Sequence, residues 1–394
     1  MSEITANAPP ELDNVGKWSL ILGVIGLLVG VIWWFFNSEQ FFRSYLIGFV
    51  FWIGIALGCL AILMVQHMSG GAWGLVIRRV LESATRTFPL LLVLFIPLAL
   101  GVGVIYEWAH PEAVAANPLL QHKQRYLNVG FFLGRTAFYF LVWLLVSFYL
   151  NRWSLEQDRT GDRPLTRKLQ VLSGPGLVLY GLTVTFASVD WVMSLEPEWY
   201  STIFGVLIMG GQGVSAMAFV IAVMVLLATR RPFSDILAPR HLHDLGKLLL
   251  AFIMLWAYFA FSQFLIIWSG NLPEEVPYYV RRLQAPWNYI GLFIVLFHFA
   301  LPFVMLLSRD LKRNGRLLAM VAIGVIVMRF VDLYWMIAPG FHEGGAHFSI
   351  LDLVLPVGIG GIWVWFFIQQ LKNRPLIPIR DPHLADALSQ HEGH

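Results

Sequence analysis

The chain alternates long apolar runs with short polar connections over most of its length. A helix that crosses the hydrocarbon core of a bilayer needs about 20 mostly apolar residues. The runs of that length predict ten transmembrane helices, at residues 17–36, 43–66, 86–107, 127–151, 171–195, 203–229, 246–270, 286–308, 316–339 and 349–371. These runs are longer than barrel strands and lack their apolar–polar alternation, so the pattern indicates an all-α integral membrane protein.

This pattern divides the chain into an N-terminal tail at 1–16, a ten-helix membrane domain at 17–372 and a C-terminal tail at 373–394. The first tail contains Glu3 and Glu11, whereas a signal peptide carries positive charge before its apolar segment. We therefore expect the first apolar run to be a helix of the protein and not a cleaved signal.

The composition agrees with a membrane class and excludes others. Only 13% of the residues are charged, against about 25% in soluble domains. The formal net charge is +3 and the positive residues are spread over loops, which argues against a nucleic-acid partner. The single cysteine, Cys59, excludes an internal disulfide and a cysteine-ligated iron–sulfur cluster.

Lys and Arg gather in alternate connections. The second, fourth, sixth and eighth connections and the two tails contain most of them, as in the segment from Arg152 to Lys168. The other connections contain few. Because cytoplasmic connections carry the excess of positive charge, we expect both termini in the cytoplasm and the opposite connections on the outer side.

Most ionisable and amide side chains within the predicted helices lie in their outer halves. They are Arg135, Asp190, Gln212, Gln263, Arg329, Asp332 and Asp352, with His298 near mid-membrane. The inner halves are expected to contain only hydroxyls, such as those of Ser215 and Tyr180, and His67 at a helix end. A charge at mid-bilayer costs at least about 2.5–3.5 kcal/mol on insertion scales, so such residues usually line an internal site or pair with each other. We therefore expect a shared polar pocket between the outer halves of the fourth, fifth, ninth and tenth helices.

Some of these charges can also pair without any further role. Arg329 and Asp332 lie three residues apart, so they share a helix face and can form an ion pair within one helix. Arg135 can likewise neutralise Asp190 across the fourth and fifth helices.

Three residues are candidates for proton transfer. Asp190 and Asp352 have no cation in their own helices, although Asp352 can also lie in the hydrated headgroup zone. His298 is either a hydrogen-bonded packing residue or a member of a proton relay, since the unperturbed pKa of His is about 6.5. With Asp332, these residues form the predicted proton-transfer set inside the helices.

Two outer connections contain acidic or imidazole groups and no Lys or Arg. Glu196 lies in the fifth connection and His342 in the ninth, where each can pass protons to water or belong to an ordinary solvated turn. The spacing of His and Glu matches no metal motif, so we expect no metal. We also expect no haem, because a b-type haem needs axial ligands from two helices at matching depth, and the depths of His67 and His298 differ.

Three stretches carry a resemblance to a known family. Residues 186–202 read Phe-Ala-Ser-Val-Asp-Trp-Val-Met-Ser-Leu-Glu-Pro-Glu-Trp-Tyr-Ser-Thr, residues 268–275 read Trp-Ser-Gly-Asn-Leu-Pro-Glu-Glu, and residues 329–335 read Arg-Phe-Val-Asp-Leu-Tyr-Trp. Together with the ten-helix plan, they resemble the polysulfide-reductase membrane-subunit (NrfD-like) family, and within it the membrane subunits of bacterial alternative complex III.

The resemblance implies two four-helix bundles, helices 2–5 and 6–9, flanked by helices 1 and 10. It implies a membrane subunit of a quinol:electron-acceptor (cytochrome c-type) oxidoreductase complex in the bacterial cytoplasmic membrane, which supports quinol oxidation and proton translocation. The implied partners are a homologous ten-helix quinol-binding subunit, extracytoplasmic iron–sulfur and haem c subunits, and membrane lipids. Quinone or menaquinone is then the redox species beside this chain, which holds no haem or iron–sulfur cluster itself.

Two other functions fit the same pattern. A stand-alone secondary transporter would have its site near the midplane between repeats, and a scaffold subunit would use its buried charges for assembly alone. Copurification of haem and iron–sulfur subunits distinguishes the transporter from the other two.

Overall fold

The structure, a computed structural model, describes residues 9–230, 232–341, 348–378 and 380–381. This part of the chain is helical and contains no strand. It includes ten spans that are long and apolar enough to cross a membrane, which makes the chain a multi-pass, all-α membrane protein.

The ten spans are built mainly from thirteen helical elements, and the fifth and ninth spans each end in a 3-10 turn given below. These are α1 (Glu11–Trp34), α2 (Ser38–Ser69), α3 (Ala72–Thr85), α4 (Phe88–Leu100), α8 (Val129–Thr160), α9 (Pro164–Trp191), α10 (Phe204–Leu227), α12 (Pro239–Gly270), α14 (Trp287–Ile294), the π-helix η3 (Val295–Ala300), α15 (Leu301–Leu307), α17 (Gly315–Ile337) and α18 (Leu351–Lys372). The third span joins α3 to α4, and the eighth joins α14, η3 and α15.

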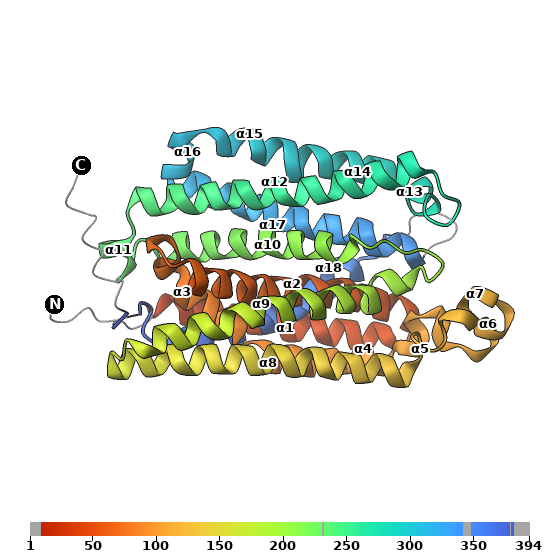
Figure 1. Ribbon diagram of the computed structural model, residues 1–394, viewed down its shortest axis with the longest axis horizontal. Coiled ribbons are helices and arrows are strands. Elements are labelled where there is room, and N and C mark those ends of the chain that lie inside the picture. The colour runs from red at the N-terminus through yellow and green to blue at the C-terminus, as the bar shows by residue number, and fades with distance from the viewer. Residues whose placement is uncertain (1–8, 231, 342–347, 379, 382–394) are drawn as a thin grey trace.

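Short helical elements lie in the connections or, for η2 and η4, at the ends of spans. They are α5 (Val102–Ile105), α6 (Pro111–Ala116), α7 (Pro118–Lys123), α11 (Phe233–Ile236), α13 (Pro277–Arg282), α16 (Arg309–Arg313) and the 3-10 turns η1 (Glu107–Ala109), η2 (Met193–Leu195) and η4 (Ala338–Phe341). In Figure 1, α11 and α16 lie at one end of the molecule, and α6, α7 and α13 lie at the other. We call the end with α6, α7 and α13 the outer end, following the orientation predicted from the charges.

Polar side chains fix the helix ends where the sequence predicts connections. Asn37, Asn128 and Asn314 each accept a backbone N–H from the first turn of α2, α8 and α17, at 3.0, 2.9 and 3.2 Å. At its other end α8 stops at Gly161, whose φ of +69° belongs to the left-handed region that favours glycine.

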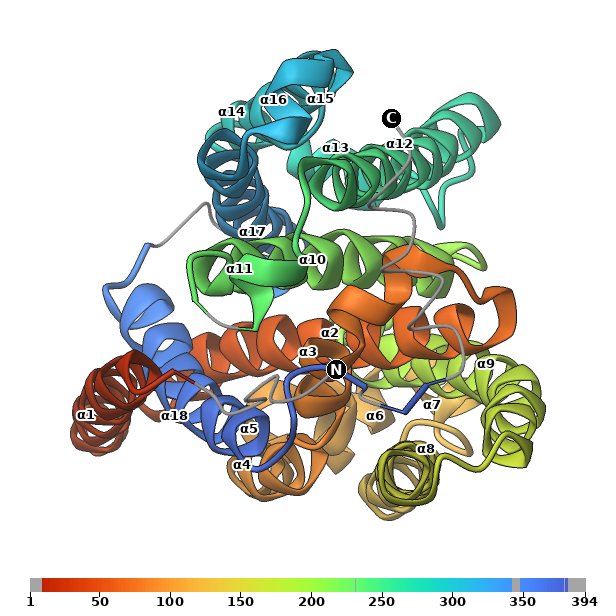
Figure 2. The same cartoon turned by 90° about the vertical axis from the view of Figure 1, so that its left-hand side faces the viewer.

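Helices α2 and α10 lie at the centre of the molecule (Figure 2) and pack against each other. Helix α2 also contacts α9 and α18, and α10 also contacts α12 and α17. Helix α1 packs along α18 at the edge, where Lys372 contacts Asp13. Because the central pair joins helices 2–5 to helices 6–9, the grouping into two separate four-helix bundles stays a prediction.

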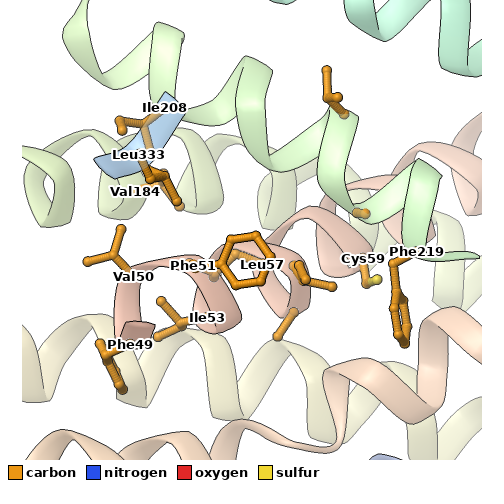
Figure 3. Close-up of a cluster of buried hydrophobic side chains, with 14 of the residues drawn as sticks. Phe49, Val50, Phe51, Ile53, Leu57, Cys59, Val184, Ile208, Phe219 and Leu333 are labelled. Carbon is orange, nitrogen blue, oxygen red and sulfur yellow. The ribbon is translucent and has the colours of Figure 1, made fainter. Parts of the chain in front are cut away.

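An apolar layer formed by α2 lies at the middle of the bundle. Figure 3 shows buried apolar side chains of this region, among them Phe51 and Leu57 of α2, Ile208 of α10 and Leu333 of α17. From residue 55 to residue 65, α2 has only apolar side chains and glycine. The layer therefore separates the polar groups at the two ends of the molecule.

The third span differs from its prediction. It runs from Trp73 to Leu100, whereas the sequence pattern gave 86–107. Arg78, Arg79 and Glu82 fall in the connection predicted between residues 66 and 86, but they lie inside α3 and are buried. Their charges compensate one another, so the helix can continue through a segment that is polar in sequence.

Candidate functional site

Arg135 and Asp190 form a bidentate ion pair between α8 and α9. The Arg135 guanidinium donates from Nε and Nη2 to the two carboxylate oxygens at 2.9 and 2.8 Å, and the Tyr139 hydroxyl donates to the same carboxylate at 2.7 Å. Asp190 is fully buried. The alternative in which Arg135 neutralises Asp190 is therefore the arrangement found, while a proton-carrying role for Asp190 stays a prediction.

Arg329 and Asp332 form the ion pair that their spacing predicts, one turn apart on α17, and both are buried. The guanidinium of Arg329 lies against Gly211 of α10, where a Cβ atom would overlap it. Arg329 also lines a cavity with room for about one water molecule.

Gln212 and Ser215 of α10 line the same small cavity as Arg329. The Tyr180 hydroxyl of α9 donates to the Gln212 side-chain oxygen at 2.6 Å. The polar groups of helices α9, α10 and α17 thus meet near mid-membrane, beside the apolar layer.

His298 lies in the π-helix η3 and is fully buried. Its ring makes an edge-to-face contact with the Trp256 indole, with centroids 4.3 Å apart. Within the described chain, neither imidazole nitrogen has a hydrogen-bond partner. The contact with Trp256 agrees with a packing role, whereas the hydrogen bond of that interpretation has no partner among the described protein atoms.

Gln263 lies further toward the outer end, on α12. Its amide donates to the Tyr279 hydroxyl at 3.1 Å and accepts from the Ser201 hydroxyl at 3.0 Å. Burial raises the pKa of Tyr279 to about 12, so this phenol stays protonated at neutral pH. Gln263 thus connects α12 to α13 and to the segment before α10.

Glu196 is held in an ion pair that the sequence analysis did not anticipate. Arg282 of α13, which is fully buried, donates to its carboxylate at 2.7 Å, and Arg281 donates at 3.3 Å. Arg282 also donates to the carbonyl of Met336 at 2.8 Å. Glu196 is therefore not part of an ordinary solvated turn.

Asp352 is buried in the first turn of α18. It accepts from the Ser44 hydroxyl at 2.6 Å, the Gln40 amide at 3.0 Å, the Ser349 backbone N–H at 3.1 Å and the Tyr334 hydroxyl at 3.3 Å. No Lys or Arg of the described ranges pairs with it. A proton-transfer role for Asp352 stays a prediction.

The predicted shared pocket is not found. Arg135 and Asp190 lie between α8 and α9, Arg329 and Asp332 lie on α17 against α10, and Asp352 contacts α2. Helix α2 packs against α9, α10 and α18 and so lies between these groups. Similar depth in the membrane does not bring residues together when their helices point them toward different neighbours.

His342 lies outside the described residues. Among the residues that the structure does describe, no three His, Cys, Asp or Glu side chains are close enough together to hold a metal ion.

A buried ion cluster near the inner end corrects the expectation that only hydroxyls and His67 lie there. Glu82 of α3, fully buried, accepts from Arg79 at 2.5 Å, from Arg78 at 3.1 Å and from the Ser154 hydroxyl at 2.5 Å. Arg79 also contacts Asp158 of α8. Because these charges compensate one another, the cluster is accommodated inside the helix bundle.

The segment after α18 completes this inner cluster. Arg374 donates to Glu82 at 3.3 Å and to Asn151 at 2.8 Å, and Asp381 accepts from Arg78 at 2.5 Å. Burial lowers the pKa of Arg374 to about 10, against the attraction of Glu82, so the residue stays cationic at neutral pH. The start of the predicted C-terminal tail is therefore a docked part of the fold.

The three stretches that carry the family resemblance meet at the outer end. The Trp199 indole donates to the Glu275 carbonyl at 3.1 Å, which joins the first stretch to the second. Arg282 joins the first to the third, since it binds Glu196 and donates to the Trp335 carbonyl at 3.3 Å.

Comparison with known proteins identifies no family for this chain. No protein-family model matches the chain, and no curated protein is significantly similar to it. The family resemblance therefore rests on the three stretches and the ten-helix plan.

Proposed function

We propose that this chain is one of the two related ten-helix membrane subunits of a bacterial alternative complex III, or its counterpart in a related NrfD-like complex. In this proposal it belongs to a quinol:electron-acceptor (cytochrome c-type) oxidoreductase in the bacterial cytoplasmic membrane, with both termini in the cytoplasm. It supports quinol oxidation by the complex and takes part in proton translocation.

The observation that carries the proposal is the meeting of the three resembling stretches at one end of the bundle. They are distant in sequence, yet Trp199 of the first donates directly to Glu275 of the second, and Arg282, which lies outside all three, bridges the first to Trp335 of the third. A chance likeness of separate segments gives no reason for such contact, whereas a docking or redox face built from all three would require it. The extracytoplasmic iron–sulfur and haem c subunits and the homologous ten-helix subunit are the partners that the proposal assigns to this chain.

Proton translocation is supported by a series of buried polar groups in the outer half. It runs from Glu196 and Arg282 past Gln263 and Asp332 to Arg329 beside the mid-membrane cavity. From Gly54, beside this cavity, to Gln66 near the inner cluster, α2 rises roughly 18 Å at about 1.5 Å per residue. The intervening apolar layer prevents an uncontrolled proton leak, so transfer across it would require a conformational or hydration change.

Purification of the chain from its native membrane in mild detergent tests the proposal. We expect haem c, iron–sulfur and second ten-helix subunits to copurify, and the assembly to transfer electrons from menaquinol to a cytochrome c-type acceptor. A chain that purifies alone and transports a solute in vesicles would instead favour a secondary transporter.

Within an assembled complex, substitution of the buried polar groups distinguishes the two remaining functions, which are proton translocation and a scaffold role. Reduced proton release per electron supports translocation through this chain. Unchanged proton release in variants of Asp190, Asp332 and Asp352 would leave a scaffold role.

A further inference from the structure

A cavity lies between the outer ends of α14, α17 and α18. Its volume is about 480 Å³, within the range of about 300–1,000 Å³ that is usual for ligand sites. Its lining includes the strongly exposed side chains of Tyr289, Phe348 and Leu353. These residues belong to the first turns of membrane spans or adjoin them, so the cavity opens toward lipid.

The cavity lies at the level of lipid headgroups. Asp352 is the second residue of the tenth span, and Tyr289 is the third residue of the eighth. The headgroup regions extend the hydrocarbon core of a bilayer from about 30 Å to about 40–45 Å, so the first turn of a span lies beside them. A lipid headgroup can therefore reach this cavity while its acyl chains stay in the bilayer.

Asp352 is the one charged residue among the described residues that line the cavity. Its four hydrogen-bond donors, described above, are all uncharged. The Gln40 amide donates to one carboxylate oxygen at 3.0 Å, and the Ser349 backbone N–H donates to the other at 3.1 Å. Because an N–H group has no lone pair to accept a proton in return, this arrangement favours the ionised carboxylate.

The nearest cation in sequence to the partners of Asp352 on α2 does not balance this charge. Arg43 forms its ion pair with Glu39 at 3.2 Å and lies over the Phe341 ring at 5.2 Å. No printed ion pair of the described ranges includes Asp352. Since charges at membrane depth usually pair with one another, a cation from outside the chain would complete the site.

Aromatic rings surround the carboxylate on the lipid side. Tyr334 and Phe348 stack with centroids 5.8 Å apart and an interplanar angle of 19°, and Tyr289, Phe293 and Phe330 also line the cavity. Aromatic faces attract cations, and cages of such rings recognise ammonium groups. An ionised carboxylate beside several ring faces is therefore chemically suited to an ammonium ligand.

We infer that this cavity binds a lipid with a primary ammonium headgroup, of the phosphatidylethanolamine class. The ammonium would donate to the Asp352 carboxylate and lie against the ring faces of Tyr334 and Phe348. A trimethylammonium headgroup has no N–H to donate to the carboxylate. The headgroup phosphate would remain on the water side, because no Lys or Arg is among the described residues of the lining.

This inference goes beyond the proposed function and does not depend on it. Phosphatidylglycerol lacks a cation, and its phosphate would be repelled by the Asp352 carboxylate. A role of Asp352 in proton transfer is compatible with lipid binding, since protonation of the carboxylate would only release the headgroup. Lipid binding is therefore measured at constant pH, apart from proton release.

Photolabelling of the full chain in phosphatidylglycerol nanodiscs tests the inference. The probes are phosphatidylethanolamine, phosphatidylcholine and phosphatidylglycerol, each with a diazirine in one acyl chain close to the ester. We expect the phosphatidylethanolamine probe alone to label 289–293 and 348–353 strongly, with protection by excess unlabelled phosphatidylethanolamine. Equal labelling of these segments by the three probes, or labels spread evenly over the lipid-facing helices, would overturn the inference.

Two pairs of variants sharpen the test. Asp352→Asn removes the charge and is expected to lower labelling by the phosphatidylethanolamine probe at least about tenfold, as for a lost hydrogen bond to a charged group. Asp190→Asn is its control, because Asp190 is a buried carboxylate that pairs with Arg135 and does not line the cavity.

Phe348→Leu keeps an apolar side chain and removes one ring face. We expect it to lower labelling about threefold, as for one cation–π contact at an exposed site. Its control is Phe138→Leu, which removes an exposed ring of α8 outside the cavity.

Equal labelling of Asp352→Asn and Asp190→Asn would reject the site. If Asp352→Asn does not fold, the second pair decides, and equal labelling of Phe348→Leu and Phe138→Leu would reject the inference. Loss of the specific labelling when the chain is assembled with partner subunits would also reject it, since a partner would then fill the cavity.

Discussion

Gly211 of α10 lies directly against the guanidinium of Arg329 on α17. This guanidinium fills the space that a side chain at position 211 would occupy. The close approach of the two helices at this point lets Arg329 reach both Asp332 and the mid-membrane cavity. The ion pair therefore requires a residue without a side chain at position 211. Glycine meets this need through its small size and not through its backbone flexibility.

We expect Gly211→Ala to destabilise the protein, by up to about 3–5 kcal/mol where the buried ion pair is broken. Gly324→Ala is the matched control, because a Cβ at this helical glycine of α17 meets no atom within 4 Å. Thermal unfolding in detergent, followed by tryptophan fluorescence, measures the difference. Equal melting temperatures for the two variants would contradict the packing argument.

The Arg329–Asp332 pair can be tested by removing one charge or both. Asp332→Asn leaves Arg329 buried without its carboxylate, so we expect impaired assembly and a loss of about 3–5 kcal/mol. The double variant Arg329→Met, Asp332→Leu removes both charges and should recover much of that loss. Yields of folded protein and melting temperatures of Arg329→Met, of Asp332→Leu and of the double variant form the cycle, and additive effects would show that the residues do not interact.

Asp190→Asn tests whether this carboxylate carries protons or only holds Arg135. Arg135 keeps the Tyr126 carbonyl at 2.9 Å and the Tyr126 ring at 3.8 Å, so we expect an assembled complex with normal haem content. We further expect fewer protons released per electron in reconstituted vesicles. An unchanged ratio, with similar losses of stability in Asp190→Asn and Arg135→Gln, would show that the pair is structural.

Asp352→Asn is expected to reduce proton release without separating an ion pair. In this variant the side-chain amide nitrogen at position 352 would face hydrogen-bond donors that now bond to a carboxylate oxygen. The lost hydrogen bonds would lower the stability of the protein by about 1–3 kcal/mol. Ser349→Ala serves as the control, since it keeps the backbone N–H that donates to Asp352. The ratio of protons to electrons in vesicles provides the measurement, and equal ratios in the two variants would exclude a proton-transfer role for Asp352.

The orientation of the chain can be determined by cysteine labelling. Cys59 is fully buried, so it leaves a low background for introduced cysteines. A membrane-impermeant maleimide added from outside should label Glu274→Cys in the connection before α13 and not Thr160→Cys at the end of α8. The opposite pattern would place both termini outside and reverse every depth assigned from the charges.

The sequence predicts the spanning helices well wherever apolar runs and charges are separate. It fails at the third span because Arg78, Arg79 and Glu82 look like a loop when read alone. Their neutralising partners include Asp158 and Arg374, which are distant in sequence. The hydropathy pattern does not show that distant charges neutralise one another. The predicted third helix therefore begins too late, at the next apolar run.

The same limit applies to the candidate site. The Arg329–Asp332 pair follows from helical spacing alone, and the Arg135–Asp190 pair could be anticipated because their helices are adjacent in sequence. The Glu196–Arg282 pair could not, since it depends on how two outer connections fold over one another. The unpartnered nitrogens of His298 depend on a π-helical turn, for which the sequence gives no recognisable signal.

The docking of Arg374 on Glu82 has a consequence for biogenesis. Helix α3 leaves the ribosome early, with Glu82, Arg78 and Arg79 already in place, whereas Arg374 follows the last transmembrane helix. The inner ends of α3 and α8 thus acquire one of their counter-charges only after α18 has been inserted. The contacts of Arg374 with Glu82 and of Asp381 with Arg78 therefore form only once the whole membrane domain has been synthesised, which ties the packing of the earliest charged helix to the insertion of the last one.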